Sequence, residues 1–225
     1  MPGADGLYQA ARLALLDALF ALDAHRDAII LVGAQAIYCR VGEADIAVAP
    51  TTTDADLALD PHRLAEFPAL DTLMREAGFE KRVRLGQGAQ PGIWERTVPG
   101  TPILVAVDLL VPAGTASPKG RRSARLPGHA KDAAMKVVGI EGALVDNDCL
   151  EIKDARGRSC SVRVAGPAAL LVAKVHKIED RLSTPSRLTD KDALDVFRLL
   201  RGTATGEMAD RMRLVMSDDR SRPVA

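Results

Sequence analysis

The chain has 225 residues, and 30 Lys and Arg residues balance 30 Asp and Glu residues, so its formal net charge is zero at pH 7. This length suits one substantial core, or one domain with a smaller helical appendage. The neutral balance excludes a basic character spread over the whole chain for binding nucleic acid. Aromatic residues make up only 3%, which argues against platforms that stack single-stranded bases.

The cysteines and the N-terminus predict a reducing, cytoplasmic setting. Cys39, Cys149 and Cys160 are odd in number and form no CxxC pair, so we expect neither a disulfide framework nor a structural zinc site. No separate base motif supports Cys39 as a nucleophile, and we expect a structural role for it. The first residues carry no basic region, and no run reaches the roughly 18 apolar residues of a membrane span.

The first part of the chain predicts a helix, a strand, a turn and a second helix. Apolar residues recur at helical spacing over residues 6–23, which is typical of an amphipathic helix. The apolar run at 28–32 predicts a short strand, Gly33 a tight turn, and residues 34–40 a helix. A second strand is expected at 54–59, with acidic residues near its start.

The middle of the chain is more mixed. Pro61 is expected to open a helix over 64–77 that ends at Gly78. Strands are predicted at 93–96 and 102–111, and the segment 112–131 is a loop rich in Pro, Gly and Ser. Two interpretations of its basic residues stay open, a disordered connector or a surface that binds RNA phosphates. These residues are Lys119, Arg121, Arg122 and Arg125.

The last third predicts a hairpin followed by helices. Residues 150–153 and 161–164 form the expected hairpin, Pro167 starts a helix to about 181, and Thr189 is a suitable N-cap for a helix at 191–201. A last helix is expected at 207–216. The fold class is therefore α/β (α+β), a small mixed sheet flanked by helices with a helical C-terminal part. We expect an α/β core at 1–145, the hairpin and helical part packing on it at 146–217, and a flexible tail at 218–225.

Three acidic residues are the main candidates for chemistry. In an extended strand Asp54 and Asp56 point to the same face. Asp108 interrupts the apolar run 103–111, where an isolated ionised carboxylate needs a cation or a donor. If the two strands pair, the three acids gather and suit one or two Mg²⁺ ions that grip a phosphate. The alternatives are solvent-facing acids at a strand end for Asp54 and Asp56 and, for Asp108, an acid at a strand edge or one that pairs with a buried arginine.

The motifs resemble those of the DNA polymerase beta-like nucleotidyltransferase superfamily, which has a Gly-Gly or Gly-Ser turn, an Asp-x-Asp strand and a third Asp. Here they are Leu31-Val32-Gly33-Ala34-Gln35-Ala36-Ile37, Thr53-Asp54-Ala55-Asp56-Leu57 and Val107-Asp108-Leu109-Leu110. Within it the chain is most similar to the toxin-type nucleotidyltransferases of the AbiEii group. Their C-terminal pattern of Lys, Arg and Lys-Asp-x-x-Asp is matched by Lys174, Arg181 and Lys191-Asp192-Ala193-Leu194-Asp195.

The resemblance implies a Mg²⁺- or Mn²⁺-dependent nucleotidyltransferase that moves an NMP from an NTP such as ATP to a hydroxyl. Asp54 and Asp56 would hold the ion that bridges the triphosphate, and Asp108 would complete a second site and act on the attacking hydroxyl. The resemblance to the toxin group implies a tRNA 3′ end as the acceptor and a cognate antitoxin as a partner. A protein or small-molecule acceptor also stays open.

The resemblance also implies nucleotide-binding residues. Gly33 and Ala34 would let backbone N–H groups approach the phosphates, and Lys174 and Lys177 would contact the triphosphate or its pyrophosphate. Ala34 stands where many family members have Ser or Gly, which removes a hydroxyl donor. Alternatively, the two lysines form a solvated helix face. The acids between the turn and the second strand, Glu43 and Asp45, either line the site or belong only to the loop.

Two other functions and one structural alternative remain. A non-catalytic protein of the same fold would serve as a binding or regulatory partner. A two-metal phosphohydrolase would also use aspartates, but such enzymes usually add His ligands, which the sequence lacks near its acids. Lys191, Asp192 and Asp195 alternatively make only pairs within their own helix.

Overall fold

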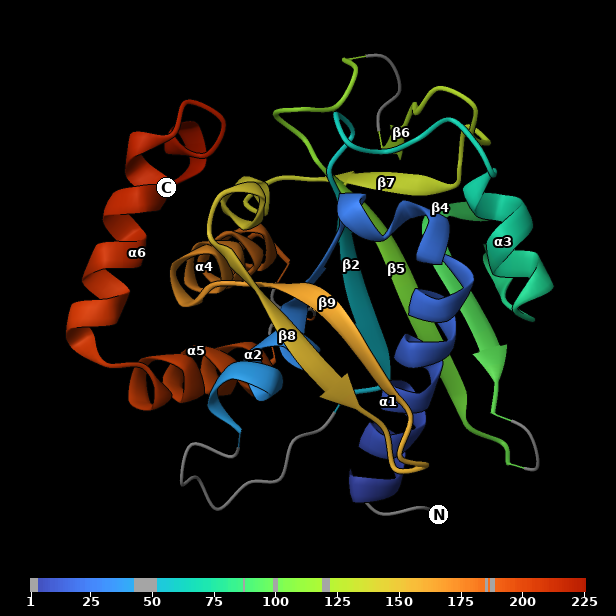
Figure 1. Cartoon of the computed structure of the whole chain (residues 1–225), viewed down its shortest axis with the longest axis horizontal. Helices are drawn as coiled ribbons and strands as arrows, with labels where there is room; N and C mark the ends of the chain where they lie inside the picture. The colour runs from blue at the N-terminus through green and yellow to red at the C-terminus, as the bar shows by residue number, and fades with distance from the viewer. Residues whose placement is uncertain are drawn as a thin grey trace.

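The computed structural model describes residues 4–42, 52–86, 88–98, 101–118, 122–184, 186 and 189–225, with side chains from residue 6 onwards. Within these residues a single mixed sheet of nine strands organises the fold (Figure 1). Its strands are β1 (Ile29–Val32), β2 (Asp54–Leu59), β3 (Glu80–Arg84), β4 (Gly88–Thr97), β5 (Leu104–Pro112), β6 (Ser123–Ala124), β7 (Ala134–Val137), β8 (Asn147–Lys153) and β9 (Ser159–Ala165).

Helices flank this sheet, as the predicted mixed α/β fold class requires. They are α1 (Ala4–Ala21), α2 (Gly33–Val41), α3 (Leu70–Glu76), α4 (Pro167–Leu182), α5 (Asp190–Gly202) and α6 (Thr205–Ser217), with short 3-10 helices at Asp23–Ala28, Glu141–Leu144 and Arg222–Val224. Among the described residues, no helix combines the length and the apolar character that a membrane crossing needs.

The sheet has the order β3-β4-β5-β2-β1-β9-β8, and β7 pairs with the end of β5 and with β6. β1 and β2 are antiparallel, whereas β2 and β5 are parallel, as are β1 and β9. The central strands β1, β2 and β5 are almost entirely apolar and buried, as expected for strands covered on both faces. Only their acidic residues interrupt this core.

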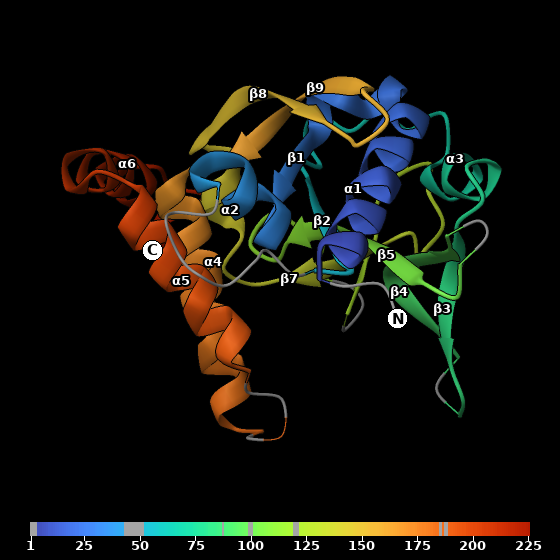
Figure 2. The same ribbon diagram turned by 90° about the horizontal axis from the view of Figure 1, so that it is seen from below.

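Helices cover the sheet and extend it on one side. α1 lies between the β8–β9 hairpin and β5 (Figure 2) and packs Leu15 and Leu16, which are fully buried, into the core. α2 packs against β1 and β2 and also touches α4 and α5. Figure 2 shows α4 and α5 running side by side away from the sheet, with α6 beyond them. This helical part therefore meets the sheet where β1 passes into α2.

The helix expected at 64–77 is wrong in its first part, because α3 begins only at Leu70. Pro68 has no N–H and restricts the residue before it, so residues 61–69 form turns and bends instead. His129 Nδ1 accepts the Leu70 N–H at 3.1 Å in place of a side-chain N-cap. The predicted end at Gly78 is confirmed, since this residue has a φ of +79° and follows Ala77, the C-cap of a helix that ends at Glu76.

Two other parts of the chain differ from expectation. The predicted strand at 93–96 is part of the longer β4, and its partner β3 escaped prediction because that edge strand is largely exposed and has no apolar alternation. The segment 218–225, expected to be a flexible tail, contacts the body of the protein. Ser221 is fully buried and donates to Val215 O at 2.6 Å, and His176 Nε2 lies 2.7 Å from Val224 O.

Candidate functional site

Pairing of β2 with β5 gathers the three predicted acids. The parallel register places Asp56 directly opposite Asp108, and Asp54 lies two residues earlier on β2. All three residues are partly buried. The expected strand pairing is therefore confirmed, and it brings three carboxylates to one place in the sheet.

Two of these carboxylates have a pKa above the usual value of an aspartate. Burial and the charge of Asp54 raise the pKa of Asp56 above its usual value. Burial, together with the charges of Asp56 and Asp54, raises the pKa of Asp108 to about 8. Asp108 Oδ1 is buried without a hydrogen-bond partner, and within the described chain no salt bridge reaches this residue. The expected alternative, a pair with a buried arginine, is thus not found there.

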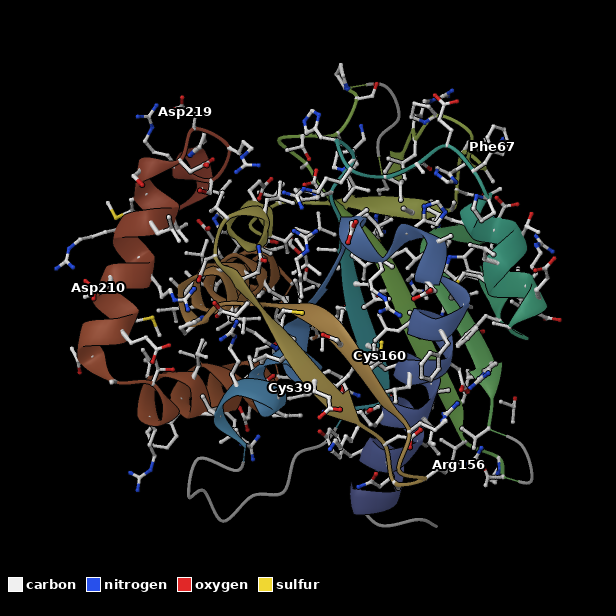
Figure 3. All side chains as sticks on the ribbon, viewed as in Figure 1. Cys39, Phe67, Arg156, Cys160, Asp210 and Asp219 are labelled. Carbon is white, nitrogen blue, oxygen red and sulfur yellow. The ribbon has the colours of Figure 1, made fainter. Side chains whose placement is uncertain are left out.

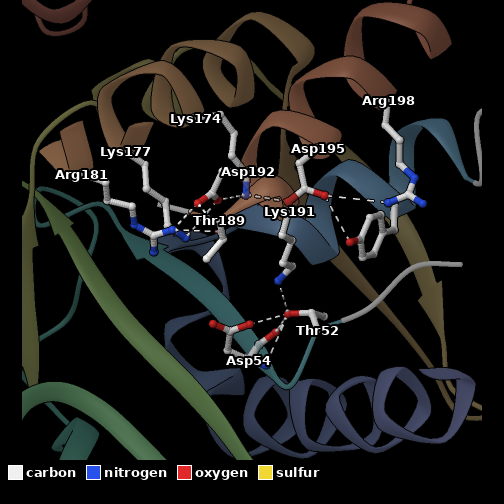
Figure 4. Close-up of polar contacts among 11 residues, drawn as sticks. Thr52, Asp54, Lys174, Lys177, Arg181, Thr189, Lys191, Asp192, Asp195 and Arg198 are labelled. Atoms are coloured by element: carbon white, nitrogen blue, oxygen red, sulfur yellow. Dashed lines mark hydrogen bonds and ion pairs between the residues drawn. The ribbon is translucent and has the colours of Figure 1, made fainter. Parts of the chain in front are cut away.

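Asp54 has a different environment. Its carboxylate accepts a hydrogen bond from the Thr52 hydroxyl, and Lys191 Nζ lies 3.3 Å from that same hydroxyl (Figure 4). Burial opposes ionisation of Asp54, but the Thr52 hydroxyl and the charges of Lys191 and Lys177 outweigh it and lower the pKa. Asp54 therefore ionises more readily than its two neighbours.

The turn from β1 into α2 lies against Asp56. Val32, the last residue of β1, pairs with Asp56, and Gly33 begins the helix with a φ of +69°. A Cβ built on Gly33 would lie only 2.0 Å from Asp56 Oδ2, so this turn requires glycine for both its conformation and its space. No side chain caps α2, and its first N–H groups, with Ala34 buried among them, form an end that favours anions.

A network of charges joins α4 to α5 (Figure 4). Lys174 is only 4% exposed, and its Nζ lies 2.7 Å from Asp195 Oδ2 and 3.1 Å from Asp192 Oδ1. Arg181 also pairs with Asp192, and Lys177 Nζ lies 3.7 Å from it. Lys174 is therefore not part of a solvated helix face, and the two aspartates pair mainly between helices rather than within one.

The lysines differ in what they can contact. Lys174 is enclosed by its two aspartates, whereas the Lys177 side chain is 44% exposed. The charge of Lys177 acts to lower the pKa of each of the three site aspartates, although burial and the neighbouring acids outweigh it at Asp56 and Asp108. Lys191 and Thr52 were not among the predicted site residues, although Lys191 belongs to the Lys-Asp-x-x-Asp motif. Their contact with Asp54 depends on how α5 packs, which no local pattern reveals.

A cavity of about 580 Å³ adjoins this region. Lys191 belongs both to its wall and to the contact with Thr52 beside Asp54. The lining residues are Tyr38, Asp190, Lys191, Ala193, Leu194, Phe197 and Arg198. This volume lies in the range of sites for small organic molecules.

The three aspartates offer a metal ion carboxylate oxygens as ligands. In the part of the chain that the structure describes, no three His, Cys, Asp or Glu side chains are already arranged to hold a metal. The chemistry nevertheless fits Mg²⁺ or Mn²⁺, which prefer carboxylate oxygens. The buried, unpartnered Oδ1 of Asp108 and the raised pKa values are what crowded carboxylates show without a cation.

Some sequence-based candidates lie outside the described residues, namely Glu43, Asp45, Lys119 and Arg121. The other two residues of the basic loop, Arg122 and Arg125, flank β6. The structure therefore brings together the acids and Gly33, and leaves the role of the basic loop a prediction.

Comparison with known proteins adds two weak structural matches. No protein-family model and no curated protein matches the chain. A solution structure of the antibiotic-resistance factor ANT(2'')-Ia shares 15% identity over 90% of this chain and 89% of that chain, with a TM-score of 0.45. A crystal structure of ANT(2'')-Ia in complex with adenylyl-2''-tobramycin shares 15% identity over 90% and 94%, with a TM-score of 0.44. The resemblance of the chain to the AbiEii group stays a prediction.

Proposed function

We propose that this protein is a metal-dependent nucleotidyltransferase, which moves an NMP from an NTP to a hydroxyl acceptor. The observation that supports this most is the Asp108 carboxylate, which lies opposite Asp56 with one buried oxygen that has no partner. Burying a carboxylate beside two others is unfavourable in the protein alone. The arrangement becomes favourable if a cation binds between the three carboxylates in the active enzyme.

The residues that would hold this cation are the three aspartates. Asp54 and Asp56 would share a Mg²⁺ or Mn²⁺ ion with the triphosphate, and Asp108 would complete the site from β5. When bound, the metal neutralises charge on the phosphate oxygens and lowers the pKa of the attacking hydroxyl. Nucleotidyl transfer needs little else from the protein beyond correct positioning.

Other groups would act on the phosphates. The first N–H groups of α2, made accessible by the side-chain-free Gly33, would donate to phosphate oxygens. Lys177 and Lys191, both close to the aspartates, would offset charge on the departing pyrophosphate. Lys174 would act as a positioning residue, because its ion pairs fix α5, which carries Lys191, against α4.

The reaction forms one phosphorus–oxygen bond and breaks another. The acceptor oxygen attacks the α-phosphorus, the bond from that phosphorus to the bridging oxygen breaks, and pyrophosphate leaves with the electron pair. The proton of the acceptor hydroxyl would pass to Asp108, the carboxylate that β5 places opposite Asp56.

We also propose which molecule supplies the acceptor hydroxyl. The tRNA 3′ end, with a toxin-like role and a cognate antitoxin as partner, follows from the sequence resemblance alone. The cavity beside Lys191, with Tyr38 and Phe197 in its wall, offers room for one ring of a nucleotide or of a small acceptor. A cytoplasmic location belongs to the same proposal.

A catalytically inactive binding or regulatory protein of the same fold is the second candidate. Two observations favour it, the absence of a hydroxyl at Ala34 and the engagement of Lys174 by two aspartates. Such a protein would have no transfer activity, and the charge crowding at Asp56 and Asp108 would have to be relieved by protonation alone.

Transfer of label from α-³²P-NTPs tests the proposal. Wild type, Asp54→Ala and Asp108→Ala are incubated with Mg²⁺ and with separate pools of tRNA, protein and hydroxylated antibiotics. We expect the wild type to label one pool and both variants to transfer label more than about 100-fold more slowly. Mutation of residues that only support a metal ligand already reduces activity by up to that factor. Full activity in either variant contradicts the three-carboxylate mechanism, and no labelling of any pool favours the inactive candidate.

A further inference from the structure

A second cavity lies between α1, the end of α2 and the β8–β9 hairpin, and it shares no lining residue with the carboxylate site. Figure 3 marks Cys39 on α2 beside this hairpin. The cavity has a volume of about 350 Å³, which lies near the lower end of the range for small-molecule sites. Its lining residues are Tyr8, Gln9, Arg12, Cys39, Leu150, Glu151, Ile152, Lys153, Asp154 and Ala155.

Arg12 is the unusual residue of this cavity. It is only 6% exposed, one terminal nitrogen lies 3.1 Å from Cys39 Sγ, and the other donates to the Tyr8 hydroxyl. Among the described residues no carboxylate pairs with it. Other poorly exposed arginines do pair with aspartates: Arg40, Arg96, Arg181, Arg198 and Arg211.

The remaining charges in the cavity wall are already balanced. Lys153 Nζ lies 3.2 Å from Glu151 Oε2, and Asp154 accepts from Arg158 Nε at 2.7 Å. The positive charge of Arg12 is thus uncompensated by the described residues that line the cavity. A buried cation without a counter-ion is unfavourable, so an anion from outside would be bound at this position.

The rest of the wall suits an apolar group. Leu150, Ile152 and Ala155 contribute aliphatic surface, and the Tyr8 ring lies 5.3 Å from the Arg12 guanidinium. A guanidinium presents paired N–H donors that match two oxygens of one oxyanion.

From these contacts we propose that this cavity binds a small organic acid, with its oxyanion head on Arg12 and its apolar body along the hairpin and Tyr8. A carboxylate and a phosphate monoester share this head-group chemistry. The ligand would lie against Cys39, because the Cys39 thiol and Arg12 are in direct contact. The proposal does not depend on the nucleotidyltransferase function.

Cys39 provides a reporter of occupancy that needs no assay of activity. The protein is alkylated with neutral iodoacetamide, and mass spectrometry follows each cysteine, with the exposed Cys149 as internal reference. Benzoate at about ten times its Kd should slow alkylation of Cys39 roughly tenfold, as its occupancy requires. Its neutral isostere benzamide should have no such effect, and Cys149 should react at the same rate throughout. Phenyl phosphate is run in parallel, and the better protector identifies the preferred head group.

Matched variants locate the binding charge. In Arg12→Gln, benzoate should no longer slow the alkylation of Cys39. In Lys153→Gln, which lacks the neighbouring exposed cation, benzoate should slow it as much as in the wild type. Tyr8→Phe leaves Arg12 in place and removes one of its present acceptors, so it should lower the benzoate concentration for half-protection even if Arg12→Gln does not fold. Equal protection by benzamide, protection that survives Arg12→Gln, or no protection by either acid overturns the proposal.

Discussion

Replacement of Asp108 by asparagine should stabilise the metal-free protein, and the gain should grow as the pH rises. Asparagine has nearly the same shape as aspartate but carries no charge. Asp108 Oδ1 has no hydrogen-bond partner, so the substitution removes an unfavourable buried charge and breaks no bond to that atom. Stability gained at the cost of function is common at active sites.

The size of the effect follows from the pKa of Asp108, which burial and the charges of Asp56 and Asp54 raise from 3.8 to about 8. The folded protein therefore holds a proton that the unfolded chain releases above about pH 4. Its stability falls as the pH rises from about 4 to 8. Each pH unit corresponds to about 1.4 kcal/mol, so the advantage of Asp108→Asn should increase by on the order of 4 kcal/mol between pH 5 and pH 8.

Urea unfolding of wild type and Asp108→Asn in EDTA, at pH 5 and pH 8, measures this difference. We expect the variant to be the more stable protein at both pH values, with the larger margin at pH 8. The reasoning is refuted if the margin is independent of pH or if the variant is less stable at pH 8, because Asp108 would then have a favourable partner when ionised.

The remaining predictions concern the turn and the lysines. Gly33→Ala should lower stability by about 1–3 kcal/mol from backbone strain, and its new methyl group should displace the Asp56 carboxylate and so weaken binding of Mg-NTP. The control Gly157→Ala, at a φ of +79° with open space around it, should lower only stability. Equal nucleotide binding in the two variants would contradict this role of Gly33. Lys174→Met should cost about 3–5 kcal/mol in urea unfolding, because it removes the buried cation that two buried carboxylates share. Lys177→Met should change stability by less than about 1 kcal/mol but reduce the affinity for Mg-NTP in calorimetric titration, and the reverse pattern would exchange the roles of these two lysines.

Local sequence patterns determined most of the elements. The apolar runs at β1, β2 and β5 predicted buried strands. The prediction held because these three strands pair with one another in the centre of the sheet. The start of α3 was misjudged because its first N–H group is satisfied by His129, a residue 59 positions away. The strand β3 was missed because an exposed edge strand needs no apolar alternation, so its pairing with β4 leaves no mark in its own sequence.

The candidate site was predictable where chemistry and strand period coincide. Alternation in β2 put Asp54 and Asp56 on one face, and an acid within an apolar strand marked Asp108. The partners of the lysines could not be predicted in this way. Whether Lys174 faces solvent or two aspartates depends on how α4 and α5 pack together, and the contact between Arg12 and Cys39 likewise depends on the docking of α1 against α2.

The most direct test of the nucleotide site is a melting scan of wild type and Asp56→Asn with each of the four NTPs, with and without Mg²⁺. A ligand at about 100 times its Kd stabilises the folded state by roughly 2.7 kcal/mol, which corresponds to a rise in Tm of roughly 5–10 °C for a chain of this size. We predict such a rise in the wild type only when metal and NTP are both present, and none in Asp56→Asn. No shift with any nucleotide, or an equal shift in the variant, would contradict a metal–nucleotide site at these carboxylates.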